Sequence, residues 1–132
     1  MAKLTSQQIK ELADYFLAMA EAIGDYRIRN FHSLTKAQND ELSASSKQVL
    51  QFADELYTLA ATLVLDDVQN SLSTIKQVTG EMKNTYQKLL QVQDALDIAG
   101  SAVTFCKAVV SLNPHSIIVA TGGLIACLKA VH

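Results

Sequence analysis

The side chains of this sequence that could do chemistry are few and stand far apart. The histidines His32, His115 and His132 have no second ligand at the spacing that a metal site requires. His115 and Ser116 are adjacent, as a base and a nucleophile could be, but the region around them has no carboxylate to orient the base. We therefore interpret Ser116 as a capping residue at a helix start and His115 as a side chain that faces solvent.

Two pairs of adjacent residues, and the absence of a known metal-binding motif, also argue against a catalytic or metal site. Asp66 and Asp67 could suggest a metal site, but neighbouring residues on a helix point about 100° apart, and a helix cap explains them better. Gly122 and Gly123 lack the strand and the lysine that flank a phosphate-binding loop. The Glu-x-x-His pair of di-iron bundles does not occur. We predict no catalytic, cofactor-binding or metal-binding residue, and no enzyme activity.

The cysteines Cys106 and Cys127 are predicted to be buried, unpaired thiols. If Asn113 and Pro114 form a turn between antiparallel helices, the two cysteines lie about 10 Å apart along the helix axes, which is too far for a disulfide. Free thiols are typical of a reducing compartment. The N-terminal residues lack the apolar run of a signal peptide. We expect a cytoplasmic protein.

The composition predicts an all-α protein. Apolar residues make up 49% of the 132 residues and charged residues 18%, which excludes a disordered chain. The recurring residues are good helix formers, and five glycines and one proline leave few places to turn. The net charge of −2 excludes the basic surface typical of nucleic-acid binding. The charge is uneven, because residues 98–132 contain Lys107 and Lys129 but no acidic residue.

Two amphipathic helices are predicted in the first half, over residues 6–23 and 35–64. Each begins at a capping box, Thr5 with Gln8 and Thr35 with Gln38. Gly24 suits the position just past the end of the first helix. Residues 25–33 then form a loop or one or two further turns. We expect their apolar side chains to fold back on the bundle and their arginines to face water. The apolar residues are Tyr26, Ile28 and Phe31, and the arginines are Arg27 and Arg29.

The strongest pattern is an apolar heptad that runs from Leu65 to Leu96 with alternating steps of three and four. Its phase is shifted from that of the preceding stripe, which comprises Leu42, Val49, Phe52, Leu56, Leu59 and Leu63. The shift predicts a tight hairpin between antiparallel helices over 35–64 and 67–97. Asp66 and Asp67 would cap the start of the second helix. The alternative is one bent helix over 35–97, about 94 Å long, which would require a partner.

Three polar residues in the heptad indicate what kind of neighbour the apolar face of this helix packs against. Thr79, Tyr86 and Gln93 occupy positions that a dry two-stranded coiled coil fills with apolar side chains. They favour packing within a bundle of three to five helices over an intermolecular coiled coil.

Residues 98–131 are predicted to form an apolar helical hairpin, with helices over 98–112 and 115–131. Each helix has a face of small residues that would let a neighbouring helix approach closely. These faces are Gly100, Thr104 and Ala108, and Gly122, Ala126 and Ala130. Lengths of about 22 and 26 Å are short for a hydrocarbon layer of about 30 Å, and Lys107 lies in the shorter helix. We interpret the hairpin as buried core or as an oligomer interface.

Together these patterns predict an up-and-down bundle of four or five helices with a C-terminal apolar helical hairpin, as one domain over residues 1–132. The expected function is non-enzymatic association, with further copies of the chain or with another helical protein, and without nucleic acid or cofactors. The alternative is a protein that inserts hairpin 98–131 into a membrane on a trigger. In layout alone, amphipathic helices followed by an apolar hairpin resemble helical pore-forming proteins. In a third reading, the hairpin packs on another part of a longer protein.

Overall fold

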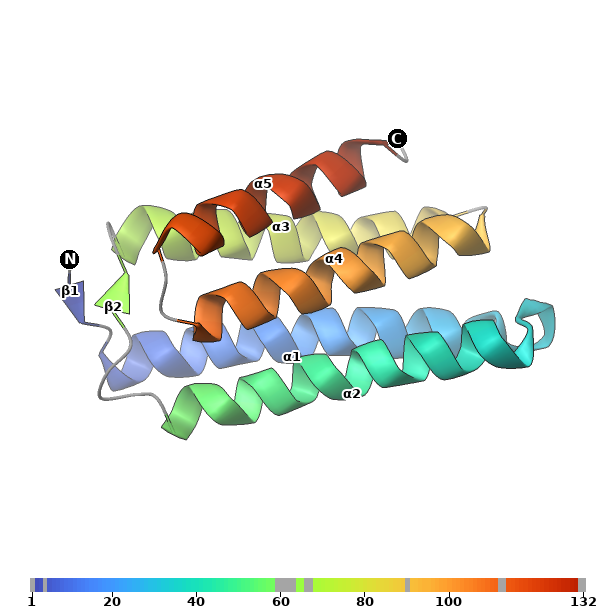
Figure 1. The fold of residues 1–132 in the computed structure, drawn as a ribbon, viewed down its shortest axis with the longest axis horizontal. Helices are drawn as coiled ribbons and strands as arrows, with labels where there is room; N and C mark the ends of the chain where they lie inside the picture. Colours follow the sequence, from blue (N-terminus) through green and yellow to red (C-terminus); the bar gives the residue numbers. More distant parts are fainter. Residues whose placement is uncertain are drawn as a thin grey trace.

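The computed structural model describes residues 2–3, 5–58, 64–65, 68–89, 91–111 and 114–130. The described residues form five α-helices: α1 (Ser6–Arg29), α2 (Lys36–Thr58), α3 (Val68–Lys88), α4 (Val92–Val110) and α5 (Pro114–Ala130). A short 3-10 turn, η1 (Phe31–Ser33), follows α1. Each helix runs in the opposite direction to the one before it (Figure 1). The predicted all-α, up-and-down bundle with a C-terminal helical hairpin is confirmed.

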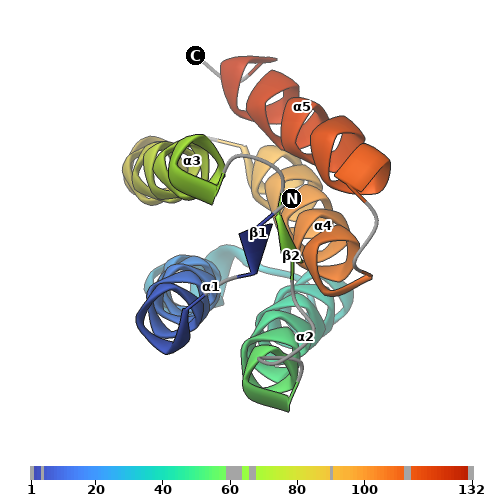
Figure 2. The same cartoon turned by 90° about the vertical axis from the view of Figure 1, so that its left-hand side faces the viewer.

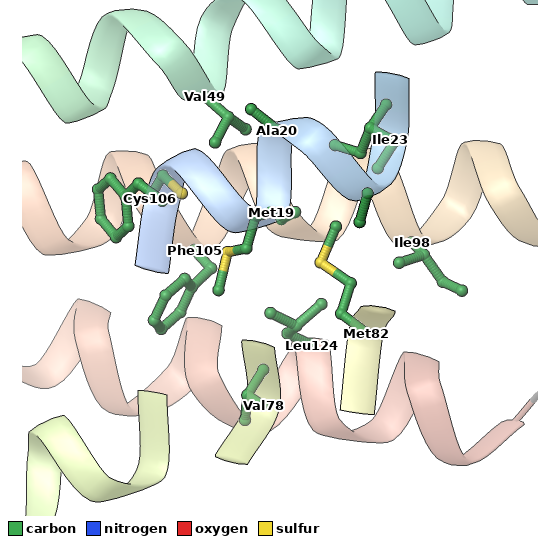
Figure 3. Packing of buried hydrophobic residues seen from close by; sticks show 14 of the residues in the cluster. Met19, Ala20, Ile23, Val49, Val78, Met82, Ile98, Phe105, Cys106 and Leu124 are labelled. Carbon is green, nitrogen blue, oxygen red and sulfur yellow. The ribbon is translucent and has the colours of Figure 1, made fainter. Parts of the chain in front are cut away.

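The helices surround one hydrophobic core. Helix α1 packs against α2 and α3, α2 also packs against α4, and α5 lies across α4 and, to a lesser extent, α3 (Figure 2). Side chains from α1, α3, α4 and α5, among them Met19, Met82, Phe105 and Leu124, meet between the helices (Figure 3). The rings of Phe16 and Phe105 pack edge to face with centroids 6.3 Å apart, which joins α1 to α4.

Both predicted capping boxes are present. The backbone N–H of Gln8 donates to Thr5 Oγ1 at 3.1 Å, and the backbone N–H of Thr5 donates to Gln8 Oε1 at 2.9 Å. Thr35 and Gln38 make the same pair of hydrogen bonds, at 3.1 and 2.9 Å. These bonds satisfy backbone donors that a helix start leaves without intrahelical partners, so the starts of α1 and α2 are encoded locally.

Helix α1 does not end at Gly24 as predicted but continues to Arg29 and is capped by Asn30. Asn30 Nδ2 donates to the Tyr26 carbonyl oxygen at 2.9 Å. Tyr26 is buried, and its ring packs against that of Tyr86 at 5.4 Å. The helix continues because this tertiary contact stabilises its last turns more than glycine destabilises them.

The other side chains of residues 25–33 follow the prediction only in part. Ile28 and Phe31 are 66% and 54% exposed, so they do not fold back on the bundle. Arg29 is exposed as expected, but Arg27 is half-buried and donates from Nη1 to Asn39 Oδ1 at 3.1 Å. Extending α1 as a helix turns Ile28 away from the core and brings Arg27 to the edge of α2.

The two helices predicted over 35–64 and 67–97 are antiparallel as expected (Figure 1), but the tight hairpin between them is wrong. Helix α2 ends at Thr58, and α2 packs on α1 and α4 whereas α3 packs on α1 and α5. Between them, strand β2 (Val64–Leu65) pairs antiparallel with strand β1 (Ala2–Lys3), with Ala2 opposite Leu65 and Lys3 opposite Val64. Backbone hydrogen bonding to the N-terminal segment therefore replaces helix at residues that the apolar pattern assigned to helices. The predicted cap at 66–67, and Leu59 and Leu63, lie outside the described residues.

The predicted helix over 67–97 is two helices, because α3 ends at Lys88 and α4 begins at Val92. A continuous helix over 68–110 would be about 64 Å long, whereas α1 with 24 residues is about 36 Å long. Much of its apolar face would then extend beyond the bundle. With the reversal, Leu72, Ile75, Met82 and Tyr86 of α3 and Leu96 of α4 all enter the same core. From Leu72 to Tyr86 the inward face of the heptad is therefore correct, but the helix is not continuous and Gln93 is exposed.

Candidate interaction surface

The residues that could do chemistry remain dispersed in the folded chain. Within the described ranges, no three His, Cys, Asp or Glu side chains gather as a metal site would require. His32 is exposed on η1, and His115 is exposed in the first turn of α5 with Ser116 half-buried beside it. The described lining of the groove that holds His115 and Ser116 includes no carboxylate. His132 lies outside the described residues.

The two cysteines are free, as predicted, but they differ in burial. Cys106 is buried in the core, and desolvation raises the pKa of its thiol. A buried thiol of this kind stays protonated and is inert. Cys127 is half-buried on α5, less buried than predicted.

Two small clefts lie between α1 and α3, and both have mixed polar linings. One, of about 90 Å³, contains the acidic Glu21 and Asp25 and the basic Arg29 and Lys83. The other, of about 230 Å³, includes Glu11 and Tyr15, whose hydroxyl donates to the Glu11 carboxylate. Burial of the phenol, and to a smaller extent this hydrogen bond, raises the pKa of Tyr15 to about 12. The phenol stays protonated and serves as a hydrogen-bond donor, not as a base.

The outer face of α5 is the unusual feature of the surface. A helix on the outside of a bundle normally presents polar residues to water. Helix α5 buries Leu124 and Leu128, yet Ile118 and Val119 on its other side are 70% and 60% exposed. The remaining exposed residues of this face are His115, Gly122, Gly123, Ala126, Lys129 and Ala130. The face is therefore largely apolar and has no acidic residue.

A groove runs beside this face, between α4 and α5. It comprises two hollows of about 670 Å³ and 460 Å³, which share Thr104, Val119 and Ala120 in their linings. Carboxylates of Glu41 and Asp97 border the first hollow. Lys107, His115 and small or hydroxyl side chains line the second. We call the outer face of α5 together with this groove the α4–α5 surface.

The faces of small residues predicted in the hairpin point mainly outward. Gly100 and Thr104 are exposed and line the groove, whereas Ala108 is buried. Gly122, Ala126 and Ala130 are all exposed on α5. Apart from Ala108, these residues are therefore not buried between helices of the bundle. The small-residue spacing identified the region, but sequence periodicity alone could not show which side of each helix faces out.

Space around the glycines supports this orientation. A Cβ atom added at Gly100, Gly122 or Gly123 would meet no atom within 4 Å, and the same holds for Gly80 on α3. Alanine is more stable than glycine in a helix interior. Packing among the described residues of the chain therefore does not require glycine at these positions.

No known protein family, curated protein or solved structure matched this chain in our comparisons. None of the described helices is both long enough and apolar enough to cross a membrane.

Proposed function

We propose that this chain is a non-enzymatic helical-bundle protein that works by protein–protein association, with further copies of itself or with another helical protein, through the α4–α5 surface. The observation that carries the proposal is the exposure of Ile118 and Val119 on a face without acidic residues. Apolar side chains in water cost free energy that a contact removes. Contiguous exposed apolar patches commonly mark interaction sites.

The rest of the bundle supports this role as a framework. Helices α1 to α4 bury large side chains from Leu12 to Phe105 in one core. Among the side chains of α5 whose burial the structure describes, only Leu124 and Leu128 are fully buried. The inner face therefore holds α5 on the bundle, while its outer face remains open for a partner. A rigid framework lowers the entropic cost of association, because the contact face is already formed.

Light scattering combined with size-exclusion chromatography tests the proposal on the full chain. Val119→Asp places a charge in the middle of the α4–α5 surface and should lower the average mass and raise the dissociation constant at least about tenfold. Leu50→Asp is the matched control, because Leu50 is 41% exposed on α2. It should leave the mass unchanged. A monodisperse monomer of 14.3 kDa at micromolar and millimolar concentrations, unaffected by Val119→Asp, would contradict association with further copies of the chain.

A second candidate is insertion of hairpin 98–131 into a membrane on a trigger, which the same acid-free apolar face favours. Flotation with phosphatidylglycerol vesicles over a range of pH distinguishes it. Vesicle binding by the full chain that Val119→Asp abolishes and Leu50→Asp leaves intact would support insertion. Failure to float at every pH and salt concentration would remove this candidate.

A further inference from the structure

We propose that the occupant of the α4–α5 surface is a second copy of this chain, related by a two-fold axis that sets the two α4 helices antiparallel. This inference rests on the proposed function and names its partner. The evidence is the exposed stripe of α4, whose members recur at steps of three and four. The stripe comprises Asp97, Gly100, Thr104, Lys107 and Ser111, all exposed.

When the stripes of two copies face each other with the α4 helices antiparallel, their charges are complementary. Asp97 and Lys107 lie about 15 Å apart along the helix axis, with the uncharged Gly100 and Thr104 between them. In a two-fold contact, residue i meets residue j of the other copy, and j meets i. An axis that passes between Gly100 and Thr104 places Asp97 opposite the partner's Lys107, and Lys107 opposite the partner's Asp97. A parallel arrangement would place like charges together.

Residues beside the stripe increase the difference in charge between its Asp97 end and its Lys107 end. Glu41 of α2 borders the same hollow as Asp97, so this end of the groove has two carboxylates. Lys107 lines the hollow at the other end, which has no carboxylate in its described lining. Within the described chain, neither Asp97 nor Lys107 forms an ion pair, and Asp97 accepts a hydrogen bond from Gln93 Nε2 at 2.9 Å. Both charges are therefore available to a partner.

The middle of the stripe suits the close approach of two helices. Gly100 has no side chain and open space around its Cα, and Thr104 turns its hydroxyl to the Gly100 carbonyl oxygen at 3.1 Å. Small residues at the crossing point let two backbones pack closely. Val119 lines both hollows of the groove, so the partner's α4, laid along the groove, covers an apolar side chain that is otherwise in water.

Charge reversal in the full chain tests the pairing by sedimentation equilibrium. Asp97→Lys alone, and Lys107→Asp alone, place like charges together at both contacts, so each should weaken self-association at least about tenfold. An equimolar mixture of the two variants brings opposite charges together at both contacts and should restore a dimer. Asp54→Lys, at an exposed position of α2, is the control and should leave the dimer unchanged. All these positions are exposed, and circular dichroism verifies that each variant folds.

The outcomes separate this inference from the proposed function. If Val119→Asp dissociates the protein but neither charge reversal does, the α4–α5 surface is an interface and the antiparallel pairing is wrong. If the two charge-reversal variants do not associate when mixed, the pairing is also wrong. A chain that stays monomeric at millimolar concentration overturns the inference. Flotation of such a monomer with phosphatidylglycerol vesicles would identify a lipid surface as the occupant.

Discussion

Tyr86 shows how one side chain holds two helices of this bundle together. Its hydroxyl donates to the Ala95 carbonyl oxygen at 2.8 Å, which ties the end of α3 to the start of α4. Its ring packs on Tyr26, which holds the last turn of α1. Burial raises the pKa of Tyr86, so the phenol stays protonated and remains a donor. In the heptad Tyr86 was interpreted as a polar seam residue, and the structure places it at a chain reversal.

Tyr86→Phe keeps the ring and removes the hydrogen bond, and it should lower the free energy of unfolding near pH 7 by about 1 kcal/mol. The effect should depend on pH. Because the folded-state pKa lies above the ordinary value of 10.0, the neutral phenol stabilises the fold fully below pH 10, and this stability is lost as pH rises further.

Urea unfolding at pH 8 to 11 measures this dependence. The difference between the unmodified chain and Tyr86→Phe should narrow above pH 10, since the variant has no phenol to ionise at position 86. Tyr15→Phe is the control, because Tyr15 is half-buried and its hydroxyl bonds within its own helix. Its effect near pH 7 should be smaller. A difference for Tyr86→Phe that stays constant up to pH 11 would contradict the role assigned to this phenol.

Among the helices, local signals located starts better than ends. The capping boxes at Thr5 and Thr35 were recognisable because a threonine and a glutamine three residues apart satisfy backbone donors wherever they occur. The reversal between α3 and α4 had no such signal. Gln91, the N-cap residue before α4, has an extended backbone and makes no capping hydrogen bond with its side chain, and the heptad keeps its phase across the break. Global packing, rather than local sequence, sets that reversal.

The inward face of α3 was predictable and gives a sharp test. Ile75 is 3% exposed within the core, so Ile75→Asp buries a carboxylate without a partner. The cost is comparable with the whole stability of a domain of this size, about 5–15 kcal/mol, and the variant should be unfolded by circular dichroism. Lys47→Ala, at an exposed position of α2, should change stability by less than about 0.5 kcal/mol. Equal stability of the two variants would mean that the assigned seam is misplaced.

At the level of the whole molecule, sequence predicted the hairpin but not which of its faces would be open. The phase of α5 against the core depends on where the chain reverses between α4 and α5. The few polar residues of α5 form no continuous stripe that would indicate from the sequence which side of the helix faces water. For that reason the small residues Gly100 and Gly122 were expected in a close contact, and the structure turns them outward.

Glycine-to-alanine substitutions separate folding from association. Gly100→Ala and Gly80→Ala both add a methyl group in open space, so each should raise the free energy of unfolding of the monomer by about 0.5–1 kcal/mol. Only Gly100→Ala should weaken self-association, since its methyl group lies where the two α4 helices approach. Thermal unfolding of dilute protein and sedimentation of concentrated protein measure the two effects. If both variants associate as the unmodified chain does, the two helices do not meet at Gly100.

The mass of the full chain in solution, measured by light scattering over a wide range of concentration, decides whether this bundle acts by self-association. We expect a species of twice the 14.3 kDa chain mass that Val119→Asp converts to a monomer and Leu50→Asp leaves intact. A mass of 14.3 kDa at every concentration, with the outer face of α5 open to water, would contradict the claim that the bundle acts by self-association.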